Sequence, residues 1–120
     1  MNHILIADPD QAFRKALTLL IARKLDIQRI DEAADTGTLI QKLAETPPDL
    51  LLLNWSIHGV PGPETCLLLR NTYPDMKVIL LSLNPEDAKT ARSAGAGFIC
   101  KSSSPEETLE VLRSVLTQGE

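Results

Sequence analysis

Apolar residues follow two patterns along the chain: short uninterrupted runs, and stretches in which they recur every three or four positions. Uninterrupted runs bounded by turn residues are typical of buried strands, and the second spacing is typical of amphipathic helices. The N-terminal segment shows both, because the run 3–7 ends at an Asp-Pro-Asp turn and a helical pattern follows. The inward face of that helix is expected to comprise Phe13, Ala16, Leu17, Leu20, Ile21 and Leu25.

The same alternation repeats four more times, with strands predicted at 27–33, 50–53, 78–81 and 97–100. The run 50–53 is four leucines, which is typical of a strand buried on both faces of a parallel sheet, so we expect it at the sheet centre. Five strands that alternate with five helices through short connections predict an α/β fold. The specific expectation is a doubly wound, five-stranded parallel sheet with helices on both faces.

The second helix is expected to turn Leu39, Ile40 and Leu43 inward and to end before the Thr-Pro-Pro sequence that follows it. The third helix, 63–72, follows a segment at 54–62 that is interpreted as a loop.

The fourth helix should begin with Asn84 as N-cap and Pro85 at its first position, and Gly95 should end it. A capping box at 104–107 should begin the last helix.

Composition excludes several function classes. The chain has 120 residues, consistent with a single domain, and only 3% aromatic residues, too few for a platform that stacks bases. A net charge of −4 argues against direct binding of nucleic acid by this domain. Cys66 and Cys100 are interpreted as small buried hydrophobic residues, and no apolar run is long enough to span a membrane. We therefore expect a cytoplasmic protein.

Polar residues follow the predicted strands directly, and in parallel sheets such strand ends meet at one edge, where ligands bind. The residues expected there are Asp8, Pro9, Asp10, Asn54, Trp55, Ser56, Ser82 and Lys101.

Four segments resemble motifs of the receiver domain of bacterial two-component response regulators: ILIADPD, PDLLLLNWSIHGVPG, VILLS and AGAGFICK. The resemblance covers essentially the whole chain. It implies a CheY-like, flavodoxin-like (βα)5 fold and a signalling role without enzymatic activity, in the N-terminal part of a longer regulator.

The resemblance places Asn54 where the family has the aspartate that accepts a phosphoryl group. A carboxylate attacks phosphorus through a charged oxygen, whereas an amide is neutral and its lone pair is delocalised. Asn54 is therefore not expected to form an acyl phosphate.

A second departure concerns the metal that the family holds. Asp8 matches the first acidic residue, Pro9 replaces the second, and Asp10 lies where a further acid is common. The backbone carbonyl of Ser56 matches a third ligand. Because Mg²⁺ usually needs one or two carboxylates in octahedral geometry, the loss of two acids makes binding doubtful, and no metal or other cofactor is expected. Asp10 has an alternative role as a helix cap.

The switch residues of the family are retained. Ser82 matches the hydroxyl that follows the phosphoryl group, and Phe98 matches the aromatic switch residue. Lys101 is expected to pair with Asp8 and to donate a hydrogen bond to the side-chain oxygen of Asn54. An alternative interpretation of Ser82 is an ordinary hydroxyl at the end of a strand, without a switch role.

These features predict an atypical receiver that acts through protein contacts without aspartyl phosphorylation. Its expected partners are a histidine kinase or another regulator, and a second copy bound through the fourth helix, fifth strand and fifth helix. One alternative is an ordinary receiver whose Asn54 is an inactivating change, with phosphorylation lost or moved to Asp8 or Asp10. Another is a small flavodoxin-like cofactor binder or enzyme, against which the lack of a glycine-rich loop after the first strand argues.

Overall fold

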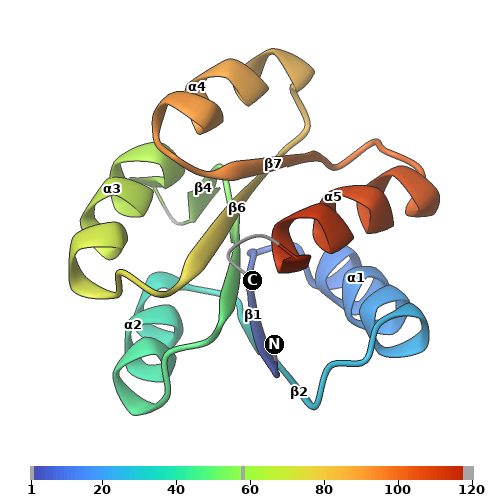
Figure 1. The fold of residues 1–120 in the computed structure, drawn as a ribbon. Helices are drawn as coiled ribbons and strands as arrows, with labels where there is room; N and C mark the ends of the chain where they lie inside the picture. Colours follow the sequence, from blue (N-terminus) through green and yellow to red (C-terminus); the bar gives the residue numbers. More distant parts are fainter. Residues whose placement is uncertain (1, 58, 118–120) are drawn as a thin grey trace.

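The computed structural model describes residues 2–57 and 59–117, and five parallel strands within them form one sheet in the order β2-β1-β3-β6-β7 (Figure 1). The predicted α/β fold class is confirmed. The run Leu50–Leu53 lies in the central strand with no exposed surface, as expected. The strands are β1 (His3–Ala7), β2 (Arg29–Ala33), β3 (Leu50–Asn54), β6 (Lys77–Ser82) and β7 (Gly97–Cys100).

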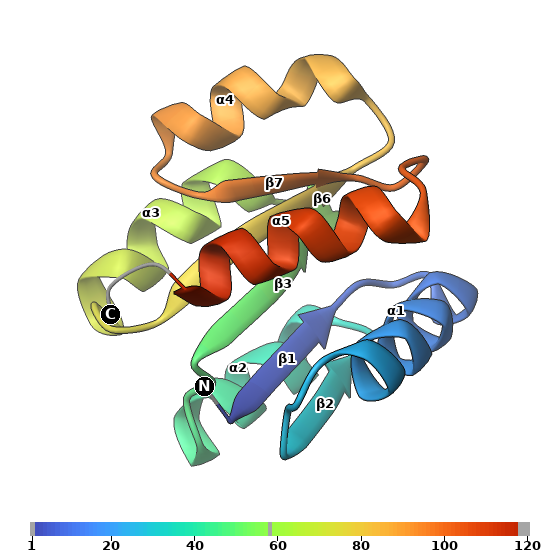
Figure 2. The same cartoon turned by 45° about the vertical axis from the view of Figure 1, so that its right-hand side comes forward.

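Helices cover both faces of this sheet (Figures 1 and 2). One face carries α1 (Gln11–Lys24) and α5 (Pro105–Thr117), and the other carries α2 (Thr36–Glu45), α3 (Gly62–Thr72) and α4 (Ala88–Ser93). Successive side chains of a strand point to opposite faces, so the leucines of β3 divide between two aliphatic clusters. No helix in the described residues is long and apolar enough to cross a bilayer.

Ala16 and Ile40, expected on inward helix faces, are exposed, and Cys100 is less buried than predicted. Ile40 is 61% exposed, because Leu39 and Leu43 lie four positions apart and already fill the inward face of α2. Ala16 lies at the edge of the buried face of α1, next to the buried Leu17, and is exposed. Cys100 is only partly buried, since it ends the edge strand β7. The wrong predictions all fall at the margins of an otherwise correct buried face.

The segment 54–62 is not simply a loop. It contains a two-stranded antiparallel hairpin, β4 (Ser56–Ile57) with β5 (Val60–Pro61), and α3 then begins at Gly62, one residue earlier than predicted. A Cβ atom on Gly62 would lie 2.9 Å from the backbone oxygen of Trp55, so only glycine fits this close approach.

The predicted fourth helix is divided into two parts. Residues Pro85–Asp87 form a 3₁₀ turn, η1, and α4 starts only at Ala88. The side chain of Asn84 caps this turn as predicted, accepting a hydrogen bond from the Glu86 amide at 3.0 Å. Gly95 has a φ of +78° and follows the last turn of α4, which confirms its predicted role as terminator.

Candidate functional site

The carboxyl ends of β1, β3, β6 and β7 bring the predicted site residues to one edge of the sheet. Asp8 follows β1, Asn54 ends β3, Ser82 ends β6 and Lys101 follows β7. These strands are neighbours in the order β1-β3-β6-β7, so the sheet register itself assembles the four side chains. Asp8 is completely buried, Ser82 is 5% exposed, and Asn54 and Lys101 are partly buried.

An ion pair joins the two ends of this row. The Nζ atom of Lys101 lies 2.7 Å from Oδ2 of Asp8, as predicted, and the two side chains are only 11% and 0% exposed. Oδ2 accepts no hydrogen bond from the described residues, so the charge of Lys101 is what balances it. The ammonium also lies 4.7 Å from the centroid of the Phe13 ring, a cation–π arrangement.

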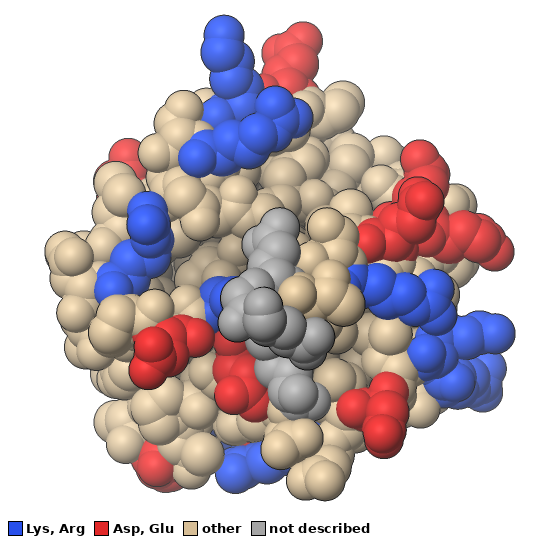
Figure 3. Space-filling view, viewed as in Figure 1, with Lys and Arg blue, Asp and Glu red and all other residues tan. Residues whose placement is uncertain are grey.

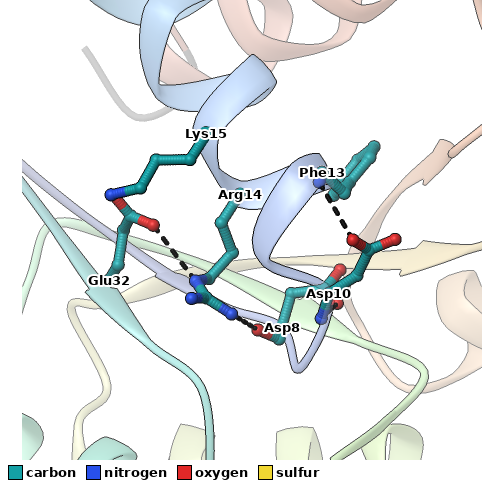
Figure 4. A network of polar contacts seen from close by, with 6 residues as sticks. All are labelled: Asp8, Asp10, Phe13, Arg14, Lys15 and Glu32. Carbon is teal, nitrogen blue, oxygen red and sulfur yellow. Dashed lines mark hydrogen bonds and ion pairs between the residues drawn. The ribbon is translucent and has the colours of Figure 1, made fainter.

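A polar network fixes the segment that carries Asp8 (Figure 4). Oδ1 of Asp8 accepts a hydrogen bond from the Asp10 amide at 2.8 Å. The side chain of Asp10 accepts one from the Phe13 amide at 3.2 Å and so caps α1, which is the alternative role considered for it. Arg14 donates to the backbone oxygen of Asp8 at 2.7 Å and pairs with Glu32 of β2.

Arg14 and Glu32 were missed from the sequence. Their spacing in the sequence does not indicate a contact, because Arg14 lies in α1 and Glu32 lies in β2, the strand that follows α1. Burial raises the pKa of Glu32, but hydrogen bonds from Lys15 and Arg14, with their charges, outweigh it and lower the pKa of Glu32 overall. The carboxylate therefore stays ionised and holds Arg14 against the Asp8 segment.

The side chain of Asn54 forms its hydrogen bond within its own segment. Its Nδ2 donates a hydrogen bond to the backbone oxygen of Ser56 at 2.6 Å. The predicted hydrogen bond from Lys101 to Asn54 is wrong: none joins these two described residues, because the ammonium is held between the Asp8 carboxylate and the Phe13 ring.

The residues present do not fit Mg²⁺. The carboxylate of Asp8 faces the Lys101 ammonium, which would repel a cation, and the carbonyl of Ser56, one of the candidate ligands, shares one of its two lone pairs with the Asn54 amide. Asp10 is exposed and caps a helix. Within residues 2–57 and 59–117, no group of three or more His, Cys, Asp or Glu side chains is placed to hold a metal ion.

Ser82 has a partner that the sequence did not indicate. Its hydroxyl donates to Oδ2 of Asp87 at 2.6 Å and accepts a hydrogen bond from the Asn84 amide at 3.0 Å. Asp87 belongs to η1, so the hydroxyl ties the end of β6 to the turn before α4. This contact depends on the geometry of the 3₁₀ turn η1, which the helix propensities of its residues do not predict.

Phe98 and Trp55 form an aromatic pair beside the site. Their ring centroids are 6.4 Å apart and their planes meet at 83°, an edge-to-face contact. Both side chains are half-buried and pack on the same aliphatic cluster of the sheet. The pair connects β7 to the segment that follows Asn54.

Residues 4–113 match the response regulator receiver domain, which covers nearly the whole chain. The chain belongs to this family. It is accordingly a receiver domain of the two-component signalling type, a signalling rather than a catalytic protein. The match to receivers leaves the small flavodoxin-like enzyme without support, whereas the sheet itself is common to both classes.

Curated relatives are similar to the chain over nearly its whole length. The chain is 30% identical over 116 residues to the transcriptional activator protein ExaE of Pseudomonas putida, covering 94% of this chain and 54% of that protein. It is 29% identical over 119 residues to the response regulator GacA of Pseudomonas aeruginosa, covering 96% and 55%. This receiver therefore spans about half the length of the relatives it matches.

Solved structures have the same fold. A two-component response regulator of the LuxR family from an Aurantimonas species superposes with a TM-score of 0.83 at 26% identity, covering 95% of this chain and 84% of that chain. A putative response regulator from Chloroflexus aurantiacus has a TM-score of 0.84 at 20% identity, covering 98% of both chains, which supports the fold.

Proposed function

We propose that this receiver acts without aspartyl phosphorylation, as an atypical receiver that signals through protein–protein contacts. The observation that carries the proposal is the side chain of residue 54. An amide ends β3 where a nucleophilic carboxylate is required, and its nitrogen is held on the Ser56 carbonyl. Without a nucleophile or a fitting Mg²⁺ ligand set, the retained Ser82, Phe98 and Lys101 act as a structural framework rather than as a phosphate-driven switch.

The receiver is proposed to be the N-terminal part of a longer regulator with a DNA-binding output. The printed names of the similar proteins, a transcriptional activator and a LuxR-family regulator, support this proposal. The net charge of −4 favours contact with DNA through the output rather than through the receiver. A histidine kinase or another regulator is the proposed partner, and α4, β7 and α5 form the proposed surface for a second copy.

One alternative concerns the origin of Asn54. An ordinary phosphorylatable receiver with an inactivating substitution at this position would have the same fold and the same Asp8–Lys101 pair. The codon for residue 54 in the native gene separates these two possibilities, because a native asparagine codon supports the atypical receiver. An aspartate codon assigns the chain to the ordinary class.

The chemical test is intact-mass analysis after incubation with acetyl phosphate and Mg²⁺. The native chain is expected to keep its mass, because the Asn54 amide is not nucleophilic. The Asn54→Asp variant is the matched control, since it restores the carboxylate at the same position. It is expected to gain one phosphoryl group.

A phosphoryl adduct on the native chain contradicts the proposal. Mapping that adduct by peptide fragmentation would identify the nucleophile, with Asp8 and Asp10 as the first positions to examine. If neither protein is modified, the site lacks more of the receiver chemistry than Asn54 alone, and the proposal of signalling without phosphate still stands.

A further inference from the structure

A groove of about 430 Å³ lies beside the site, between α1 and the start of α5. These two helices lie side by side on one face of the sheet (Figure 2). The α1 wall includes Phe13, Leu17 and Leu20, and the α5 wall includes Pro105 and Thr108. Its volume falls within the range of sites that bind small molecules, and its lining is mainly apolar.

Cations line this groove at both ends. Arg23 and Lys24 are at the last turn of α1, and Lys101 is near its first turn beside Phe13. No aspartate or glutamate among the described residues lines the groove. Arg23 and Lys24 are exposed and form no ion pair with the described residues. In a chain of net charge −4, this local excess of positive charge favours an anionic occupant.

The groove is long relative to its volume. Phe13 and Lys24 are eleven positions apart on one helix, which corresponds to about 16 Å at 1.5 Å per residue. An occupant that reaches along this line needs an elongated apolar body and an anionic end. An extended peptide is a poorer match, because its backbone N–H and C=O groups would need partners that an apolar wall does not supply.

We propose that the α1–α5 groove binds an unbranched aliphatic carboxylate. The carboxylate lies at Arg23 and Lys24, and the chain runs over Leu20 and Leu17 toward Phe13. Each methylene removed from water adds to the affinity, and the two cations determine the direction in which the chain lies.

This site has a direct connection to the receiver site, and that connection rests on the proposed function above. Lys101 lines the groove and also pairs with Asp8, while the Phe13 ring lies against its ammonium. An aliphatic chain that packs on Phe13 therefore changes the surroundings of the buried Asp8–Lys101 pair. In a receiver without phosphorylation, differential binding of such a ligand to two states supplies the free energy of switching.

The test uses decanoate, kept below its micelle-forming concentration, with calorimetry and ¹⁵N-edited NMR. Binding is expected to saturate at one decanoate per chain, with shift changes confined to residues 13–24 and 101–108. Octanoate is expected to bind about tenfold more weakly, because each methylene contributes about threefold to fourfold. Decyltrimethylammonium, which has the same chain and the opposite charge, is expected not to bind.

Two double variants separate the groove from general charge effects. Arg23→Glu with Lys24→Glu is expected to weaken decanoate binding at least tenfold. Lys89→Glu with Arg92→Glu makes the same change of charge on exposed residues of α4, where Figure 3 shows Lys and Arg side chains gathered, and should leave binding unchanged. All four positions are exposed, so both variants are expected to fold, which circular dichroism checks.

The proposal is overturned if both double variants bind decanoate equally, or if decyltrimethylammonium binds as well as decanoate. It is also overturned if decanoate fails to bind, and saturable binding of an acidic amphipathic peptide would then assign the groove to a protein partner. The proposed function is tested separately, because only a phosphoryl adduct on the native chain in the mass experiment would contradict it. Decanoate binding to a chain that is phosphorylated would leave the site in place but remove its role as the replacement for phosphate.

Discussion

At the level of single residues, the Asp8–Lys101 pair joins two charges that are almost completely buried. Removing one partner leaves the other charged and almost completely buried. Lys101→Met is therefore expected to lower the free energy of unfolding by about 3–5 kcal/mol, measured by urea denaturation. Lys15→Met is the matched control, because it breaks an ion pair whose lysine is 62% exposed, and it should cost less than about 1 kcal/mol.

A double-mutant cycle shows whether the loss belongs to the pair. Asp8→Asn combined with Lys101→Met removes both charges, so it is expected to cost clearly less than the sum of the single variants. Additive losses would show that the two side chains contribute independently, contrary to the 2.7 Å contact.

The helix α5 depends on its first turn. Ser104 Oγ accepts a hydrogen bond from the Glu107 amide at 3.1 Å, and Glu107 Oε1 accepts one from the Ser104 amide at 2.9 Å. Ser104→Ala is expected to destabilise the protein by about 1 kcal/mol in urea unfolding. Ser114→Ala, on the exposed side of the same helix, should stay within about 0.5 kcal/mol of the parent. Equal effects of the two changes would contradict the capping role.

The helix α4 depends on Gly95 at its end. Gly95 has a φ of +78°, and its amide donates to the Arg92 oxygen at 2.9 Å. Gly95→Ala is expected to cost roughly 1–2 kcal/mol, because alanine is strained in this left-handed backbone. The added methyl group would also approach the guanidinium of Arg70, but that group is the far end of a flexible, exposed side chain and can move aside by giving up its 3.1 Å hydrogen bond to the Ala94 oxygen. In an Arg70→Ala background Gly95→Ala should therefore cost nearly the same. Thermal unfolding of the four proteins measures both costs, and a much smaller cost in that background would show that Arg70 cannot move aside.

Over the whole molecule, sequence patterns predict most of the fold and only part of the site. The four leucines of β3 indicate a central strand because no polar face interrupts them. Ile40 shows the limit of such patterns, since spacing does not say how wide the buried face of α2 is. The Asp8–Lys101 pair follows from the alignment of strand ends, whereas the contact of Ser82 with Asp87 depends on a 3₁₀ turn that the pattern shows as ordinary helix.

The response of the whole molecule to acid depends on carboxylates distributed over β2 and α5. For Asp31, burial raises the pKa, but the His3 hydrogen bond and the charge of Arg29 outweigh it, and the pKa falls below its ordinary value. The pKa of Glu32 is lowered by Lys15 and Arg14, and that of Glu107 by hydrogen bonds with Ser104.

A lowered pKa in the folded state means that the unfolded chain binds more protons as the pH falls. The stability from these three groups is therefore fully present above their ordinary values of about 4, and it is lost as the pH falls through the lowered folded values. Urea unfolding between pH 7 and pH 3 should show this decline, and a variant with Asp31→Asn, Glu32→Gln and Glu107→Gln should show a shallower one. Asp26→Asn, Asp75→Asn and Glu110→Gln change three exposed carboxylates that form no ion pair with the described residues, so that variant should retain the parent slope. Equal slopes for the two triple variants would mean that other groups control the acid response.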